Sequence, residues 1–329
     1  MLRFSVNDVK RAIGSLKTEI GFDNIHSSHL KLCPQICQEL ISMLFFSFLV
    51  HNCIPISLSK GIITPFIKDK FGDLSNSDNY RPVVSSSVLL KVLEYCILHK
   101  IEPGISLNDR QHGFRHNYST STACLVLKET VMNYTQYGSD VYACFVDVSK
   151  AFDSVDHSLL LDKLVGYGIP EIFVDLLRVM YDNQFVKVRY LAHYSKEWKI
   201  SSGVRQGGVL SGLLFSIYID SLITKISHMS IGCRLALTSS NIIAYADDLV
   251  LLAPSHAGLQ IIINEAMKEI VKIGLKFNQK KTKCMVFHSS KKHISDRTIK
   301  QFVINDHPIE FVTDFKYLGI IVSGNLRDD

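Results

Sequence analysis

The spacing of apolar residues predicts that the first fifty residues are mainly helical. From Val6 to Val50 the apolar side chains recur every three or four positions, and Gly21–Asn24 separates two such segments. Helical periodicity returns over residues 88–101 and 120–137. Further along the chain, helices are expected over about residues 158–164, 170–180 and 208–222.

Short runs rich in β-branched and aromatic residues predict strands between these helices. Residues 62–67 and 81–84 flank a polar loop and predict a hairpin, and residues 185–200 predict a second hairpin region. The run 141–146 is almost continuously apolar and ends at an aspartate, which is typical of a central strand. Residues 242–245 and 249–252 predict two apolar strands joined by a tight turn. Helices and strands alternate without an internal repeat, which indicates an α+β fold.

The composition is that of a folded protein in a reducing compartment. The chain has 329 residues, of which 47% are hydrophobic, enough for one large domain or two packed subdomains. Its eight cysteines lack a framework spacing and the amino terminus lacks a secretory pattern, so we expect free thiols in an intracellular, non-secreted protein. The apolar run 40–50 is too short for a transmembrane segment of about twenty residues. The net charge of +5 favours an anionic partner without identifying one.

Three aspartates at strand ends are the candidate catalytic residues. Asp247 and Asp248 occupy a turn between two apolar strands, where like charges repel unless a cation compensates. An isolated Asp-Asp pair is more often a solvated turn, but Asp147 also ends an apolar strand, so three carboxylates could meet at one sheet edge. Ligands of this kind suit Mg²⁺. Two such ions would support in-line transfer of a nucleotide to a primer 3′-hydroxyl.

A series of short motifs resembles the reverse transcriptases of non-LTR, or LINE-type, retrotransposons. In chain order they lie at residues 21–25, 79–83, 111–115, 145–155, 203–210, 245–248, 275–283 and 315–319. Tyr245–Asp248 is similar to the Tyr/Phe-Ala-Asp-Asp box of that family, and residues 203–210 are similar to its Gly-x-x-Gln-Gly motif. Because seven or more motifs share one order over roughly residues 6–322, the chain is identified as a member of this family.

The resemblance implies a role for individual residues of the catalytic centre. Asp147, Asp247, Asp248 and the carbonyl of Val148 would be the metal ligands. Phe152 would lie beneath the incoming sugar and select deoxynucleotides, although a lone aromatic is usually a core residue.

Further residues would contact the substrates. Gln206 and Gly207 would touch nucleotide and template, and Arg81, assisted by Lys68, would bind the triphosphate. A plain loop and a solvated hairpin charge are the respective alternatives. Lys281 would protonate the leaving pyrophosphate, but the adjacent Lys280 and Lys283 leave that assignment open. The primer grip would comprise four residues, for which a structural turn is the alternative: Phe315, Tyr317, Leu318 and Gly319.

One further cluster invites a metal interpretation. The spacing of four residues would put them on roughly one face of a helix, which suggests zinc ligands: His26, His29, Cys33 and Cys37. Their apolar neighbours favour ordinary helix packing instead.

The resemblance also implies an architecture, that of a right-hand polymerase made of fingers and palm, with an antiparallel palm sheet backed by helices. The fingers, with an N-terminal helical extension, are expected over residues 1–125. The palm is expected over residues 126–322, interrupted by a fingers-side segment at about 156–200. Residues 323–329 would be the truncated start of the connection to a thumb, and the thumb itself is expected to be missing.

The activity that this resemblance implies is RNA-directed DNA polymerisation with two Mg²⁺ ions, for which Mn²⁺ could substitute. RNA template, DNA primer and dNTPs would be the partners, with no membrane, in the nucleus or cytoplasm. The alternative is an inactive retrotransposon remnant that acts at most as a nucleic-acid-binding module. It is favoured by departures from the family, which usually has proline near Arg205 and at Gly212, and often serine at Gly208. An RNA-dependent RNA polymerase is disfavoured by Phe152 and Ala246, and a group II intron maturase by the motif at 21–25.

Overall fold

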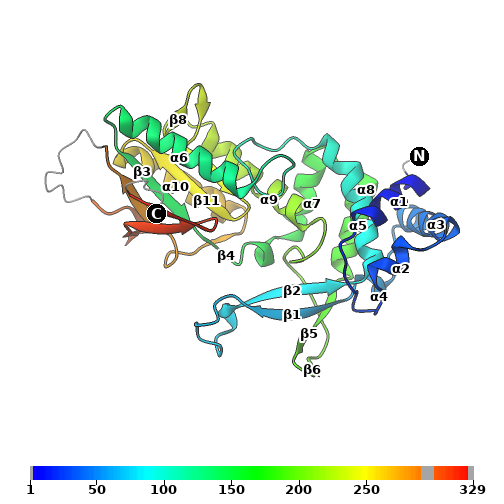
Figure 1. Ribbon diagram of the computed structural model, residues 1–329. Helices are drawn as coiled ribbons and strands as arrows, with labels where there is room; N and C mark the ends of the chain where they lie inside the picture. The colour runs from blue at the N-terminus through cyan, green and yellow to red at the C-terminus, as the bar shows by residue number, and fades with distance from the viewer. Residues whose placement is uncertain (1–2, 290–299, 325–329) are drawn as a thin grey trace. The chain divides into compact units, whose positions relative to one another are not determined.

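The computed structural model describes residues 3–289 and 300–324, and the chain divides into two compact units (Figure 1). Unit 1 comprises Met1–Ser106 and Val155–Leu214, and unit 2 comprises Leu107–Ser154 and Phe215–Asp329. Each unit is therefore built from two separate stretches of chain. The finer boundaries expected for fingers and palm, at residue 125 and around 156–200, stay predictions.

Unit 1 is helical at its start, as the apolar spacing predicts. Its α-helices are α1 (Val6–Ser15), α2 (Ser27–Lys31), α3 (Gln35–His51), α4 (Ile56–Ser59), α5 (Val88–Ile101), α7 (His157–Gly166) and α8 (Glu171–Asp182). Ser5 and Asp8 form a reciprocal capping box at the start of α1, and Asp156 caps α7 by accepting the Leu159 N–H. The ring of Phe4 packs between Phe45 of α3 and Phe173 of α8, so distant helices share one core.

The two histidines of the suspected zinc cluster cap a helix. The ring of His26 accepts the Ser28 N–H at 3.1 Å, and the ring of His29 accepts the His26 N–H at 3.3 Å, which together close the start of α2. Throughout residues 3–289 and 300–324, no group of three or more His, Cys, Asp or Glu side chains could hold a metal ion as it stands. Both histidines therefore have a local structural role.

A mixed sheet forms the other part of unit 1. Strands β1 (Gly61–Ile67) and β2 (Tyr80–Ser86) pair antiparallel over their full length, which confirms the first predicted hairpin; η1 (Ser77–Asn79) lies in its connection. Strand β5 (Phe185–Tyr190) pairs parallel with β1 and antiparallel with the short strands β6 (His193–Tyr194) and β7 (Trp198–Lys199). The second hairpin region is thus also confirmed.

Unit 2 is organised around a five-stranded sheet whose central strand is β3 (Val141–Val146). The order is β10-β11-β3-β13-β16, with bounds Ile242–Tyr245, Asp248–Ala253, Val141–Val146, Lys283–Phe287 and Glu310–Phe311. Strands β10, β11, β3 and β13 pair antiparallel, and only β16 joins its neighbour β13 in parallel. The predicted central strand and the two predicted strands at 242–252 are confirmed.

Helices pack on both faces of this sheet. Helix α6 (Thr120–Gln136) contributes Ala123, Leu127 and Val131 to the core that covers Val141, Ala143 and Phe145 of β3. Tyr142 points to the opposite face, where its ring contacts His256 at the start of α10 (His256–Lys272). Helix α9 (Ser211–Ser227) runs across the division between the units. The palm sheet expected from the sequence, antiparallel and backed by helices, therefore has its counterpart in unit 2.

Short elements complete the chain. They are η2 (Glu102–Gly104), β4 (Val148–Ser149), η3 (Phe152–Ser154), β8 (Arg234–Leu235), β9 (Thr238–Ser239), β12 (Lys276–Phe277), β14 (Val303–Ile304), β15 (His307–Pro308), β17 (Asp314–Tyr317) and β18 (Ile320–Ser323). None of the helices that the structure describes combines the length and the apolarity that crossing a bilayer requires.

Within unit 1, the segment before α9 is held by side-chain and main-chain bonds. The Val84 N–H donates to the Gln206 carbonyl at 2.9 Å. Gly207 has φ +102°, and a Cβ there would approach the Val84 carbonyl oxygen to 3.2 Å, so the turn requires glycine. The Ser211 hydroxyl donates to the carbonyls of Arg205 and Gly208, which closes the start of the helix beside the Gln206-Gly207 pair.

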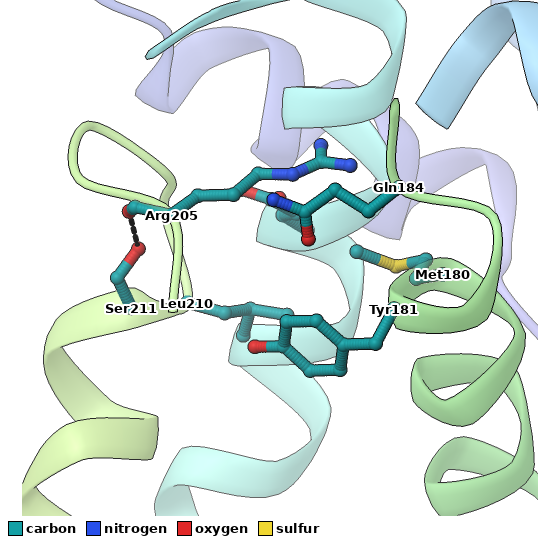
Figure 2. A pocket seen from close by; sticks show the side chains of 7 residues that line it. Met180, Tyr181, Gln184, Arg205, Leu210 and Ser211 are labelled. Atoms are coloured by element: carbon teal, nitrogen blue, oxygen red, sulfur yellow. Dashed lines mark hydrogen bonds between the residues drawn. The ribbon is translucent and has the colours of Figure 1, made fainter. Parts of the chain in front are cut away.

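Two opposite charges are buried beside this turn. Arg205 is 6% exposed and Glu94 is 3% exposed, and both line one small cavity together with residues of α8. Figure 2 shows Arg205, Gln184 and Tyr181 directed into this cavity. Burial raises the pKa of Glu94 and lowers that of Arg205, while their mutual attraction favours both charged forms. Arg205 also donates to the Ser59 carbonyl at 2.7 Å, and Glu94 accepts the Val209 N–H at 2.6 Å.

We predict that replacing Arg205 by methionine lowers the free energy of unfolding by about 3–5 kcal/mol, because the buried Glu94 loses the nearby positive charge that most favours its ionised form. Chemical denaturation followed by circular dichroism measures this. Arg178→Met is the matched control, since Arg178 and Asp175 are an exposed pair on α8, 3.9 Å apart, and we expect an effect below about 1 kcal/mol. Equal losses in the two variants would contradict a stabilising attraction between the buried charges of Arg205 and Glu94.

Candidate active site

The pairing of β3 with β11 brings the three predicted catalytic aspartates to one edge of the sheet. Leu249 pairs with Val146 across the two antiparallel strands, so the next residues outward, Asp248 and Asp147, are opposite one another. Directly opposed positions in such a pair have Cβ atoms roughly 5 Å apart. Asp247 precedes Asp248 in the turn that joins β10 to β11. Residues a hundred positions apart in the chain thus become neighbours.

The turn that carries Asp247 is tight. Tyr245 pairs with Asp248, which leaves Ala246 and Asp247 as the two turn residues. Ala246 has φ +56°, in the left-handed region that is usually occupied by glycine at this position of a two-residue hairpin turn. A backbone that is uncommon for alanine therefore lies immediately before the acidic pair.

The backbone of Asp147 is fixed by the segment 278–282. Its N–H donates to the Thr282 hydroxyl at 3.1 Å, and its carbonyl accepts the Asn278 N–H at 2.9 Å. Strand β12 also pairs with β4, which places Phe277 opposite Val148. From the sequence, the role expected in this segment was that of Lys281, with Lys280 and Lys283 as neighbours that leave the assignment open. The contacts of Thr282 and Asn278 with Asp147 were not predicted, because both residues bond to the main chain of Asp147 and no sequence pattern marks such bonds.

The carboxylates influence one another electrostatically. Burial and the charges of Asp247 and Asp147 together raise the pKa of Asp248 to about 6, with burial the largest cause. A cation placed among the three side chains would reverse the effect, and carboxylate oxygens are the ligands that hard divalent ions prefer. Three carboxylates at one sheet edge are therefore donors of the kind that such an ion takes. As they stand, no three such side chains among the described residues form a metal site.

A cavity of about 430 Å³ opens beside the aspartates. Its lining joins Asp147 and Asp248 to a group of lysines, Lys280, Lys281 and Lys283, and to residues 315–318. Lys283 is ion-paired with Glu310, whereas Lys280 and Lys281 make no ion pair with any residue that the structure describes. Acidic and basic groups therefore face one space large enough for part of a nucleotide.

The predicted primer grip is a hairpin that packs on the sheet. Strands β17 and β18 pair antiparallel, and Leu318 and Gly319 form the turn with φ values of +47° and +92°. Phe315 stacks on Phe145 of β3 with ring centroids 4.3 Å apart, and Tyr317 is buried in the same core. The hairpin is thus anchored on β3 at Phe145, two residues before Asp147.

Phe152 lies in a cluster of aromatic rings. Its ring stacks on Phe215 of α9 at 4.3 Å, and Phe114 meets it edge-on at 6.0 Å. Phe152 follows Asp147 by a short strand and one turn, and its side chain is only partly buried. The ring is thus supported by two aromatic neighbours and stays partly accessible to solvent.

The remaining predicted residues lie together in unit 1, around the β1–β2 hairpin. Arg81 is opposite Phe66 and is exposed, and Lys68 follows β1, where its ammonium donates to the Asp78 carbonyl at 2.8 Å. Gln206 and Gly207 are joined to β2 through Val84. The structure thus brings the predicted site residues together in two sets, one in each unit.

Comparison with known proteins shows the family to which the chain belongs. The sequence pattern of the reverse transcriptase (RNA-dependent DNA polymerase) family matches residues 68–322. The chain belongs to this family.

Individual relatives are retrotransposon proteins. The chain is 28% identical to the Retrovirus-related Pol polyprotein of type-2 retrotransposable element R2DM of Drosophila melanogaster, over 95% of the chain and 29% of that protein. It is 25% identical to the RNA-directed DNA polymerase of mobile element jockey of Drosophila funebris, over 98% of the chain and 35% of that protein. The chain thus spans about a third of the length of these curated relatives. Its predicted membership of the non-LTR reverse transcriptases is confirmed.

A solved structure shares the fold. An apo telomerase from Candida tropicalis, truncated from its C-terminal domain, superposes with a TM-score of 0.54 at 12% identity, covering 88% of this chain and 60% of the other. The predicted α+β, right-hand polymerase fold is confirmed.

The segment behind the catalytic turn contains a buried histidine. His112 is 4% exposed, its N–H donates to the Ala244 carbonyl at 2.7 Å, and its ring packs against Tyr118. Burial, together with the charges of Arg110 and Arg115, lowers the pKa of His112 from 6.5 to about 4. The folded state therefore binds this proton less readily than the unfolded state does.

We predict that His112 contributes to the loss of stability in acid. Its contribution is complete above pH 6.5 and declines as the pH falls towards 4, by up to about 3 kcal/mol. In His112→Gln, the free energy of unfolding should fall less between pH 6.5 and pH 4 than in the wild type, measured by denaturation at several pH values. The exposed His307→Gln should follow the wild type. Parallel pH profiles for His112→Gln and the wild type would refute the assignment.

Proposed function

We propose that this chain catalyses RNA-directed DNA synthesis, with unit 1 as the fingers and unit 2 as the palm. The observation that carries the proposal is the register of β3 and β11, which puts Asp147 opposite Asp248 with Asp247 adjacent. Membership of the reverse transcriptase family supports the same activity. RNA template, DNA primer and dNTPs are the substrates that we propose.

Asp147, Asp247 and Asp248 would hold the divalent ions on which the family generally depends, with the Val148 carbonyl as a further oxygen ligand. We propose two Mg²⁺, for which Mn²⁺ could substitute. When bound, such ions lower the pKa of a primer 3′-hydroxyl and neutralise charge on the triphosphate. The protein's own contribution is to keep three carboxylates on a rigid sheet edge, so that little reorganisation is needed during the reaction.

Basic residues would handle the triphosphate. Arg81 presents an exposed guanidinium whose planar donors suit phosphate oxygens. Lys68 is bonded to Asn79 across the same hairpin, two residues from the strand position opposite Arg81, so we propose that it assists Arg81 in binding the triphosphate. Lys281 is our candidate for protonating the pyrophosphate. It lines the same cavity as Asp147 and Asp248, whereas the ammonium of Lys283 is engaged by Glu310.

Neutral residues would position the other groups. Gln206 and Gly207 would contact the nucleotide and template, since the glycine turn allows close approach of the backbone. The hairpin residues Phe315, Tyr317, Leu318 and Gly319 would grip the primer beside the aspartates. Phe152, supported by Phe215, would close the site against a 2′-hydroxyl. The alternative of an inactive remnant is not favoured, because all three acids occupy the expected strand ends.

We predict that the full chain extends a DNA primer on an RNA template with Mg²⁺ and dNTPs. Asp247→Asn and Asp248→Asn together should reduce incorporation by at least about a thousandfold, which corresponds to about 4 kcal/mol of transition-state stabilisation. Gel-resolved primer extension measures the rate, and Asp73→Asn in the exposed β1–β2 connection is the control. Extension that survives the double substitution would exclude the proposed centre.

We predict that Phe152→Ala weakens the preference for dNTPs over NTPs by about ten- to a hundredfold, because the smaller side chain leaves room for a 2′-hydroxyl. The measurement is the ratio of kcat/KM for matched dNTP and NTP. Phe152→Tyr keeps the ring and should keep the preference. An unchanged ratio in Phe152→Ala would mean that Phe152 is only a core residue.

A further inference from the structure

The left-handed turn at Ala246 is braced from behind by a segment far away in the sequence. The Arg110 carbonyl accepts the Ala244 N–H at 2.9 Å, and the His112 N–H donates back to the Ala244 carbonyl at 2.7 Å. Residues 110–113 therefore run alongside the end of β10, directly before the acidic pair. This contact lies entirely within unit 2.

Within that segment, one side chain reaches the turn itself. The Oε1 atom of Gln111 accepts two backbone hydrogen bonds, from the Gly113 N–H at 2.8 Å and from the Ala246 N–H at 3.1 Å. Both partners are donors, so the oxygen of the amide must be the atom that faces them. The side chain is completely buried, which strengthens these bonds and makes their loss costly.

Two further observations show that the segment of Gln111 packs closely against the turn and that the oxygen of Gln111 makes the contact. A Cβ at residue 113 would meet the Ala246 nitrogen at 2.4 Å, so only glycine permits this approach. The Nε2 atom of Gln111 has no hydrogen-bond partner among the residues that the structure describes. The buried amide of Gln111 therefore bonds to the described residues through its oxygen and not through its nitrogen.

From this arrangement we infer that Gln111 is a positioning residue for the catalytic turn. It holds the N–H of Ala246 and stabilises the left-handed backbone there, which in turn directs Asp247 and Asp248 towards Asp147. The expected effect on catalysis rests on the proposed polymerase activity. The hydrogen bond from the Ala246 N–H to Gln111 is a property of the folded chain whatever its activity. Gln111 touches no reacting group.

The left-handed backbone at Ala246 allows a test that distinguishes positioning of the turn from a general loss of stability. Glycine adopts positive φ without the steric cost that alanine bears. If Gln111 acts by holding this conformation, then Ala246→Gly should compensate for the loss of Gln111. No such compensation is expected if Gln111 merely fills the core.

The variants are Gln111→Met, which keeps the length of the side chain and removes the acceptor, and Gln111→Met with Ala246→Gly. We expect Gln111→Met to lower kcat for primer extension about tenfold or more, with a small change in the KM for dNTP, as for the loss of one buried positioning hydrogen bond. Adding Ala246→Gly should restore kcat at least about threefold, whereas Ala246→Gly does not raise kcat in the wild-type chain. The matched control is Gln260→Met, since Gln260 Oε1 also accepts a backbone N–H, from Val303 at 3.0 Å, far from the turn in sequence.

Hydrogen–deuterium exchange of residues 242–250 provides a readout that needs no activity. Exchange in this segment should be faster in Gln111→Met and unchanged in Gln260→Met. Unchanged exchange in Gln111→Met would overturn the inference even if the polymerase is active, and so would faster exchange with no recovery of kcat by Ala246→Gly. A wild-type chain that incorporates no dNTP would refute the proposed function, and the exchange measurement would still decide whether Gln111 braces the turn. If Gln111→Met does not fold, the shorter Gln111→Asn allows the same comparison.

Discussion

Mutual repulsion among three carboxylates is the constraint around which unit 2 is built. Charges of one sign do not gather unless something rigid holds them, and here the rigid element is the pairing of β3 with β11. Because side chains alternate along a strand, a shift of one residue in this register would turn one aspartate to the opposite face. The apolar core beneath, from Val141, Ala143 and Phe145 to α6, fixes the register. Hydrophobic packing on one side of the sheet thus determines the electrostatics at its edge.

Much of this arrangement could be predicted from the sequence, because its signals are local. A buried strand that ends in an acid is visible as an apolar run followed by aspartate, and this pattern predicted the positions of Asp147, Asp247 and Asp248. Helix periodicity predicted most helices of unit 1 to within a few residues, and the β1–β2 hairpin was predicted from two runs flanking a polar loop. The resemblance of the motifs to those of reverse transcriptases then predicted which residues form the fingers and which form the palm.

The remaining features depend on partners that no local pattern reveals. Strands of two residues, such as β4 and β12, are too short to show alternation. Gln111 lies in a quoted motif, but its bond to Ala246 joins residues 135 positions apart. Glu94 appears on α5 as one acid in an apolar helix, and only the fold places it beside Arg205. Arg205 therefore lies in the interior of unit 1. From the sequence it was noted only as part of a motif that departs from the family.

The discontinuity of both units has a consequence for synthesis on the ribosome. Strand β1 pairs with β5, and β3 pairs with both β11 and β13, so each sheet joins early residues to residues made more than a hundred positions later. The nascent chain would therefore carry the apolar strand β3 without its partner β11 until residue 253 has emerged, and without its partner β13 until residue 287 has emerged. Topologies of this kind fold slowly and expose aggregation-prone surface while they wait. Chaperone supply and translation speed would therefore govern how much of the protein matures.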